Sequence, residues 1–338
     1  MNATSALVIT SISAPNPALS VYAEGCCRNG VDFIVVGDVS SPPAFDLAGC
    51  DYWSIQRQRA LPIKLAQILP ERHYARKNLG YLVAMARGAE VIVETDDDNY
   101  PREGFWSERV PSVRAILADD CGWLNVYRYY SGLHIWPRGY PLELVQQPVP
   151  ELDSFPEKKA FCPIQQGLAD GNPDVDAVYR LLLPLPVHFA IEPRIAVGSG
   201  SWTPFNSQNT TWFKEAFPLL YLPSHCSFRM CDIWRSFVAS RICWANDWRI
   251  LFHGPSVWQE RNEHNLLKDF ADELDGYLNN ASICASLAAL EIRPGVKNLA
   301  ENMVTCYRTF ISQGLVGGGE MALLEAWLED VSSGKLNI

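Results

Sequence analysis

The 338-residue sequence contains no run of about 18 consecutive apolar residues, which a membrane-spanning helix would need. Its first residues also lack the basic and apolar segments of a signal peptide, so we expect a cytoplasmic protein with no membrane span. The ten cysteines include no C-x-x-C pair, which argues against a zinc ribbon or a thioredoxin-like motif. Several lie in apolar runs, as Cys243 does, and we expect buried, reduced thiols.

Charged residues make up only 20% of the sequence, and the acids outnumber the bases to give a net charge of −10. This excess of negative charge argues against nucleic acid or an anionic membrane as the main partner. Apolar residues make up 48%, which is enough for the core of one large domain or two smaller ones. No G-x-G-x-x-G follows the first predicted strand, so dinucleotide binding is disfavoured.

Apolar periodicity predicts alternating strands and helices, and therefore an α/β protein. A strand over 6–10, a helix from Asn16-Pro17 to Gly30 and a strand over 32–38 form a strand–helix–strand unit at the start. Later predicted elements are a helix over 74–86, a buried strand over 89–96 that Pro101 terminates, helices over 177–183 and 232–244, a strand over 249–255, and a helical region over 265–330 broken at 317–319.

Asp96, Asp97 and Asp98 are the strongest candidates for a functional site. They follow a run of β-branched residues, and ligands of open α/β sheets bind beyond the carboxyl ends of the strands. Three adjacent carboxylates repel one another unless a cation lies among them. Mg²⁺ and Mn²⁺ prefer carboxylate and phosphate oxygens. We therefore predict a divalent metal that holds the diphosphate of a substrate, in preference to a solvated acidic turn.

Other polar residues at predicted element ends each have two interpretations. Asp38 ends a strand and could accept hydrogen bonds from a ribose or a base, or it could cap a turn. Arg76, Lys77 and Asn78 begin a helix, where they point either to a phosphate contact or to a solvated polar face. Asp232 lies in the first turn of a later helix and could be a general base or a cap that complements the helix dipole.

Further candidates lie in loops and after another strand. The turn-dense segment 165–176 includes Asp174 and Asp176 and could cap a helix, bind a second metal or bind an acceptor. Trp123 belongs to an aromatic group that could stack on sugar rings or form part of the core. His253 follows a predicted strand, and His264 lies close behind it in the sequence. Together these two histidines point modestly to a metal-ligand role.

Several separated motifs within residues 5–280 together resemble the STELLO family, whose plant members look like glycosyltransferases of the GT-A type. A weaker similarity runs to the reversibly glycosylated polypeptides, which act as UDP-arabinopyranose mutases and share the triple Asp, the Gln-Gly loop and the Asp-x-Trp helix. The motifs are Val36-Gly37-Asp38, Arg76-Lys77-Asn78-Leu79-Gly80-Tyr81, Glu94-Thr95-Asp96-Asp97-Asp98-Asn99, Gln166-Gly167 with Pro173-Asp174-Val175-Asp176, Phe205-Asn206-Ser207-Gln208-Asn209-Thr210, Phe228-Arg229 with Asp232-Ile233-Trp234-Arg235, and Arg261-Asn262-Glu263-His264-Asn265.

The resemblance implies a GT-A-like fold, with a mixed, Rossmann-like sheet flanked by helices as a catalytic domain over 1–264. A C-terminal helical extension over 265–338 would pack on that domain. The resemblance also implies Mn²⁺ or Mg²⁺ held by Asp96, Asp98 and His253, with Asp232 as the catalytic base. The implied donor-binding residues are Thr10, Asp38, Arg76, Asn78, Asp96, Asp97 and Arg229, and the implied acceptor-binding residues are Asp174, Asp176 and Trp123.

The expected function is metal-dependent transfer of a sugar from a nucleotide sugar, with a UDP-sugar and an inverting reaction favoured, to a hydroxyl acceptor. Two alternatives remain open at this point. One is a mutase that interconverts the pyranose and furanose forms of a UDP-sugar, and the other is a non-catalytic scaffold in a glycan-synthesis complex. We also expect the C-terminal helices to offer a surface for oligomer formation.

Overall fold

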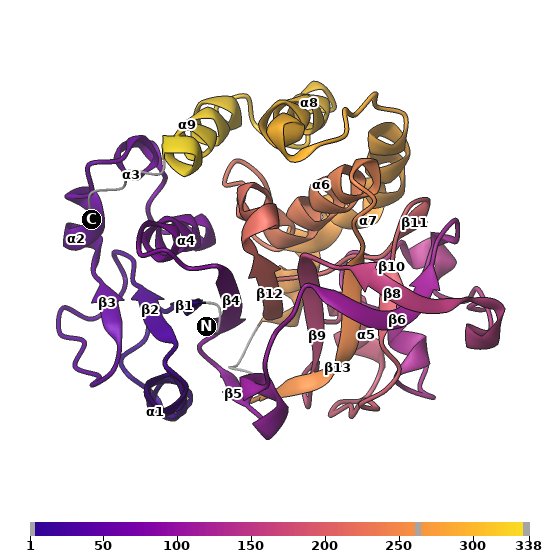
Figure 1. Cartoon of the computed structure of the whole chain (residues 1–338), viewed down its shortest axis with the longest axis horizontal. Helices are drawn as coiled ribbons and strands as arrows, with labels where there is room; N and C mark the ends of the chain where they lie inside the picture. The colour runs from indigo at the N-terminus through magenta and orange to yellow at the C-terminus, as the bar shows by residue number, and fades with distance from the viewer. Residues whose placement is uncertain (1–3, 261–264, 334–338) are drawn as a thin grey trace.

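The computed structural model describes residues 4–260 and 265–333 (Figure 1). Within these residues an eleven-stranded mixed sheet forms the centre of the molecule, in the order β3-β2-β1-β4-β12-β9-β13-β10-β6-β8 with β5 paired to β13. A two-stranded sheet of β7 and β11 accompanies it. The strands are β1 (Ser5–Thr10), β2 (Asp32–Val36), β3 (Asp51–Trp53), β4 (Val91–Asp96), β5 (Asn99–Pro101), β6 (Ser112–Ala118), β7 (Gly122–Trp123), β8 (Glu157–Phe161), β9 (Ile164–Asp170), β10 (Ile195–Val197), β11 (Ser201–Trp202), β12 (Asn209–Phe213) and β13 (Ile250–Gln259).

The predicted strand–helix–strand unit builds the parallel half of the sheet. β1 pairs in parallel with β2 and β4. Between β1 and β2, Asn16 caps α1 (Pro17–Asn29) by accepting a hydrogen bond from the Leu19 amide. Gly30 ends that helix with φ of 64°, a left-handed conformation that glycine adopts without strain. Because parallel strands end at the same edge of a sheet, the segments after β1, β2 and β4 come together there.

The other half of the sheet brings more segments to this edge. β12 is antiparallel to both β4 and β9, so the chain that enters β12 lies where β4 ends. β13 runs parallel to β9. The prediction that Pro101 terminates a strand is wrong, because it lies in β5 and pairs with Val257. Proline is tolerated in such a short strand at the margin of a sheet, where its missing N–H is not needed.

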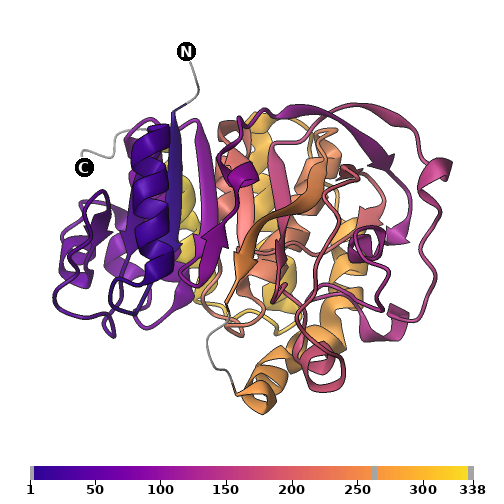
Figure 2. The same ribbon diagram turned by 90° about the horizontal axis from the view of Figure 1, so that it is seen from below.

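Helices cover both faces of the sheet, and α1 lies on the opposite face from the C-terminal helices (Figures 1 and 2). α4 (Lys77–Ala86) packs on β1 and β2 so closely that a Cβ at Gly80 would lie 2.6 Å from Val8 and from Val36. The other α-helices of the described residues are α2 (Ile55–Arg59), α3 (Lys64–Ile68), α5 (Ala177–Leu182), α6 (Cys231–Ala245), α7 (Leu266–Ala288), α8 (Leu299–Ser312) and α9 (Glu320–Ser333). Short 3₁₀ helices lie at Tyr74–Arg76, Glu103–Trp106, Val126–Tyr129, Leu142–Leu144, Leu152–Ser154, Lys214–Leu220 and Val296–Asn298.

The C-terminal helices make both apolar and polar contacts with the rest of the chain. α8 packs on α6, and α9 packs on α3 and α4. Asp330 of α9 accepts hydrogen bonds from the backbone amides of Lys64 and Leu65 at 3.2 and 2.8 Å, at the start of α3. Trp327 donates to the Pro218 carbonyl at 2.9 Å. The expected mixed α/β fold with flanking helices and a C-terminal helical region is therefore confirmed, whereas the domain boundary near residue 264 stays a prediction.

Two expectations about single residue types and segments can be compared with the structure directly. All ten cysteines are free thiols, and most are buried, although Cys27 is exposed. Among the residues described, no helix is both long enough and apolar enough to cross a membrane.

Candidate active site

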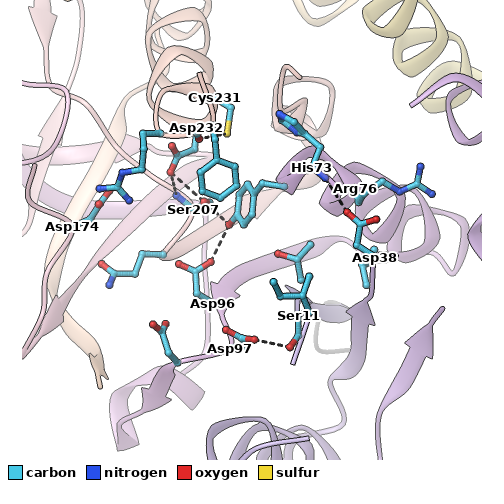
Figure 3. Close-up of a pocket in the computed structure, with 18 of the residues that line it drawn as sticks. Ser11, Asp38, His73, Arg76, Asp96, Asp97, Asp174, Ser207, Cys231 and Asp232 are labelled. Carbon is cyan, nitrogen blue, oxygen red and sulfur yellow. Dashed lines mark hydrogen bonds between the residues drawn. The ribbon is translucent and has the colours of Figure 1, made fainter. Parts of the chain in front are cut away.

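A pocket of about 440 Å³ lies at the sheet edge where β1, β2 and β4 end (Figure 3). It also draws on the loop before α4, the segment before β12, the start of α6 and the end of β13. Most of the predicted site residues line it, namely Thr10, Asp38, Arg76, Asp96, Asp97, Asp98, Asp174, Arg229 and Asp232. Sequence reasoning missed other residues of the lining, among them Ser11, Tyr74, Arg138, Ser207 and Gln259.

Asp96 lies at the centre of the pocket floor and is held by Tyr74 and Lys77. The Tyr74 hydroxyl donates to Asp96 Oδ1 at 2.9 Å and shares a hydrogen bond of 2.7 Å with Ser207 Oγ. Lys77 is wholly buried; its Nζ donates to the Tyr74 hydroxyl at 2.8 Å and lies 3.6 Å from Asp96 Oδ1. Burial raises the pKa of Asp96 to about 6, although Lys77 opposes the rise and the charge of Asp98 adds to it.

Asp97 and Asp98 are oriented by uncharged side chains. The Ser11 hydroxyl donates to Asp97 Oδ2 at 2.5 Å, and the Gln259 amide donates to Asp98 Oδ1 at 3.0 Å. Burial, together with the charge of Asp96, raises the pKa of Asp97 above its usual value. These two hydrogen bonds hold the Asp97 and Asp98 carboxylates in the pocket wall.

The donor set fits a hard cation that arrives with a ligand. No group of three or more His, Cys, Asp or Glu side chains is gathered to hold a metal within residues 4–260 and 265–333. However, Mg²⁺ is often bound through one or two carboxylates and the phosphates of a substrate. Asp96 and Asp98 supply two carboxylates, and the charge of Asp98 adds to the effect of burial in raising the pKa of Asp96. Such a site would hold the cation through Asp96, Asp98 and a diphosphate.

His253, the third predicted metal ligand, does not line the pocket. It lies on β13 beside Gly167 of β9, six residues before the pocket residue Gln259. At about 3.3 Å per strand residue, this places it on the order of 15–20 Å from the pocket end of the strand. Burial lowers the pKa of His253 to about 4, and its Nδ1 lies 2.9 Å from the Gly254 carbonyl oxygen. Burial therefore favours the neutral form of the His253 imidazole. His264 lies outside the described residues.

Asp232 begins α6 as predicted, but it is also ion-paired. Arg138 Nη1 and Nη2 donate to its two carboxylate oxygens at 3.0 and 2.9 Å, and Ser207 N and Oγ both donate to Oδ2 at 3.2 Å. The same guanidinium donates twice to Asp174, at 2.8 Å each. Burial by itself would raise the pKa of Asp232, but Arg138 lowers it to about 2. Asp232 is therefore ionised and, in this arrangement, a weak proton acceptor.

Asp38 and Arg76 lie side by side at the β2 end of the pocket (Figure 3). The His73 amide donates to Asp38 Oδ2 at 2.9 Å, which ties the loop after β2 to the segment before α4. Arg76 is 2% exposed and donates to Gln58 Oε1 and to the Leu69 carbonyl at 2.8 and 3.0 Å. Its Nη2 has no hydrogen-bond partner among the described residues. A buried N–H without a partner beside a pocket is available to a ligand oxygen.

Phe228 and Arg229 form part of the pocket rim. Phe228 is 53% exposed and packs edge-on against Tyr74, with 5.8 Å between the ring centroids. Arg229 donates to Glu273 of α7 from Nε and Nη2 at 2.9 and 2.7 Å. Its charge is therefore already paired within the protein, and α7 is tied to the rim by this contact.

Besides His253, three predicted site residues lie outside the pocket lining. The Asn78 side chain accepts from and donates to the backbone of Leu222, at 2.9 Å in each direction. Asp176 is the cap of α5 and accepts from the Tyr179 amide at 2.8 Å. Trp123 of β7 packs in an aromatic cluster with Tyr140, Trp202 and Phe237. Polar residues at the ends of helices and strands often hydrogen-bond the local backbone instead of a ligand. Here Asp176 caps a helix, Asn78 bonds to the backbone of a distant segment, and Trp123 packs in the core.

Comparison with known proteins shows similarity to one family of glycosyltransferases. The family described as STELLO glycosyltransferases matches residues 229–337. Two Arabidopsis thaliana proteins, named "Probable glycosyltransferase STELLO2" and "Probable glycosyltransferase STELLO1", are 26% and 25% identical to the chain over 89% of its length. These matches confirm the resemblance to the STELLO family that the motifs indicate. The chain spans 41% of the length of each of these relatives.

Solved structures with an overall likeness were also found. A glucosyl-3-phosphoglycerate synthase of M. tuberculosis aligns at a TM-score of 0.40 and 12% identity, covering 83% of this chain and 81% of that one. A mycobacterial protein aligns at the same TM-score and identity, covering 83% of this chain and 75% of that one.

Proposed function

We propose that this chain transfers a sugar from a nucleotide sugar, with a UDP-sugar as the favoured donor, to a hydroxyl acceptor in a reaction that depends on Mn²⁺ or Mg²⁺. The observation that carries the proposal is the position of Asp96 and Asp98 in the pocket at the sheet edge where parallel strands end. The similarity to STELLO proteins, which carry glycosyltransferase names, supports it.

Each part of the pocket has a role in this proposal. Asp96 and Asp98 would hold the cation with the donor diphosphate, and a bound cation neutralises the charge that develops on the leaving group. Asp38 and Arg76 would face the nucleoside end of the donor, where the unpartnered Nη2 of Arg76 can donate to a ligand oxygen. Tyr74 orients the Asp96 carboxylate through its hydrogen bond to Oδ1.

The acceptor would enter on the side of Asp174 and Asp232. An inverting reaction needs a proton acceptor opposite the leaving group, and Asp232 is an ionised carboxylate on this side. Because Arg138 occupies both of its oxygens, proton transfer to Asp232 requires that the Arg138 hydrogen bonds shift to Asp174. Arg138 would thus position Asp232 and hold it ionised until the acceptor binds.

The test is calorimetric titration with UDP in the presence and absence of Mn²⁺, followed by assays of sugar transfer. We expect Mn²⁺-dependent binding of UDP by the wild-type protein. Asp96→Asn and Asp98→Asn should each weaken it about 100-fold, or ~2.7 kcal/mol, with little change in melting temperature. Asp46→Asn, which changes an exposed acid, is the matched control.

The alternatives give different results in the same experiments. If the affinity for UDP changed neither on addition of Mn²⁺ nor in Asp96→Asn, the result would contradict the metal site and favour a non-catalytic scaffold. Conversion of UDP-arabinopyranose to its furanose form without any acceptor would identify a mutase.

A further inference from the structure

Gln259, the last residue of β13, carries a buried acceptor that no described residue uses. Its residue exposure is 9%, and it lines the pocket. Nε2 donates to Asp98 Oδ1 at 3.0 Å, whereas Oε1 is buried without a hydrogen-bond partner in the described part of the chain. Buried side-chain polar atoms are nearly always paired, so an unpaired one in a pocket wall indicates the place of a ligand group.

The orientation of this amide is fixed by its surroundings. The backbone of Gln259 is fixed by pairing with Asn99 between β13 and β5. Its backbone carbonyl accepts a hydrogen bond from Asn172 Nδ2 at 3.3 Å. A Cβ at Gly171 would lie 2.9 Å from the same carbonyl, so the chain approaches closely on that side too. If the amide were turned over, Oε1 would face the Asp98 carboxylate, and two acceptors would meet. Oε1 therefore stays directed away from Asp98.

The strand order separates Gln259 from the nucleoside end of the pocket. β2, which carries Asp38, lies on one side of β4, and β13 lies on the other. The acids after β4 therefore lie between an unpartnered donor, Arg76 Nη2, and an unpartnered acceptor, Gln259 Oε1. The base and ribose offer oxygens to the first. A sugar hydroxyl suits the second, because it can donate a hydrogen bond to the amide oxygen.

We propose that Gln259 Oε1 accepts a hydrogen bond from a hydroxyl of the transferred sugar and thereby selects the sugar of the donor. This inference rests on the proposed function, because it takes the diphosphate to lie at Asp96 and Asp98. A sugar that lacks this hydroxyl, or carries it in the opposite configuration, leaves the amide oxygen buried and unpaired. One neutral hydrogen bond of this kind changes affinity about five- to tenfold.

The experiment compares UDP with UDP-sugars, so that effects on the sugar are separated from effects on the metal site. Wild type and Gln259→Met are titrated, in the presence of Mn²⁺, with UDP, UDP-glucose, UDP-galactose, UDP-xylose and UDP-arabinopyranose. Methionine keeps the length of the side chain and removes the acceptor. Gln165→Met is the matched control, because the Gln165 amide donates to the Val110 carbonyl at 2.8 Å outside the pocket.

We expect wild type to prefer at least one of these sugars, and Gln259→Met to lose about five- to tenfold in affinity for that sugar relative to UDP. Gln165→Met should keep the wild-type preference. An unchanged sugar preference in Gln259→Met would overturn the inference. An equal loss for UDP and every UDP-sugar would also overturn it and would assign Gln259 to the metal site. Wild-type protein that binds none of the nucleotides would instead overturn the proposed function and this inference together.

Discussion

Glu94 and Asp96 lie two residues apart on the same face of β4, yet they have different surroundings. Glu94 is fully buried; Arg235 Nη2 and Trp212 Nε1 donate to its Oε1 at 2.7 and 2.8 Å. Asp96 has a side chain that is 31% exposed, and its nearest cation is Lys77 at 3.6 Å. The first acid is closed off by an arginine and an indole, whereas the second faces a cavity.

The comparison separates an acid that supports the fold from one that can bind a ligand. The charge of Glu94 is balanced inside the protein, and this pairing raises the pKa of Arg235 against the effect of burial. The charge of Asp96 is balanced only in part, because burial and Asp98 raise its pKa to about 6 despite Lys77. An incompletely balanced carboxylate in a pocket has reason to bind a cation, whereas a completely balanced one does not.

The largest effect on stability is expected from the buried pair. Arg235→Met should lower the free energy of unfolding by about 3–5 kcal/mol, because the buried Glu94 would lose its hydrogen-bonded arginine and keep only Lys77, at 4.0 Å, as a cation. Urea denaturation measures this change. Arg114→Met, which removes an exposed pair with Glu157, should cost less than about 1 kcal/mol. If Arg235→Met also lowered the free energy of unfolding by less than about 1 kcal/mol, Glu94 would not be an acid that supports the fold.

His253 is a titratable residue that lies outside the pocket, and its protonation should affect the stability of the fold. Its pKa is about 4 in the folded protein and 6.5 as the ordinary value, so the unfolded chain binds the proton more readily. Stability should therefore fall as the pH is lowered from 6.5 to 4, by about 2 kcal/mol from this residue. His253→Gln should reduce that part of the pH dependence in urea denaturation at pH 7 and pH 4.5.

The same variant tests whether His253 belongs with the pocket acids. A packed imidazole outside the pocket should leave Mn²⁺-dependent UDP binding at pH 7 unchanged when it is replaced. If His253→Gln kept the wild-type melting temperature but bound UDP with Mn²⁺ about tenfold more weakly, His253 would be a ligand of the metal site after all.

How much the sequence predicts depends on whether a residue acts through its neighbours in the chain or through distant partners. The run before Asp96 predicted a buried strand and the place of the acids, since both signals are local. The position of Asp232 at a helix start was equally local. Its partner Arg138 lies 94 residues away in the sequence, and no periodicity connects them. The pairing that sets the pKa of Asp232 was therefore beyond sequence reasoning.

Gln259 was missed for a different physical reason. The segment His253-Gly254-Pro255 resembles the end of a strand, and the predicted strand stopped there. In the structure β13 continues to Gln259 through an irregularity in the ladder between His253 and Val257. Such a bulge lets a strand pass a proline and still deliver its last residues to the pocket, and single-sequence patterns do not show it.

The smallest effect is expected from Tyr74→Phe, which tests how Asp96 is held. Loss of the hydroxyl removes its hydrogen bond to Asp96, its hydrogen bond with Ser207 and one acceptor of Lys77. We expect about 1 kcal/mol lower stability. Mn²⁺-dependent UDP binding should also weaken a few-fold, because the carboxylate is less well oriented.

Tyr130→Phe is the matched control for this change, since the Tyr130 hydroxyl donates to the Phe252 carbonyl at 2.8 Å away from the pocket. It should cost a similar amount of stability and leave UDP binding unchanged. If both variants lost stability alike and neither changed the affinity for UDP with Mn²⁺, Tyr74 would belong with Glu94 in the supporting core. If only Tyr74→Phe lost affinity for UDP with Mn²⁺, Tyr74 would be a positioning residue of the site, acting through its hydrogen bond to Asp96.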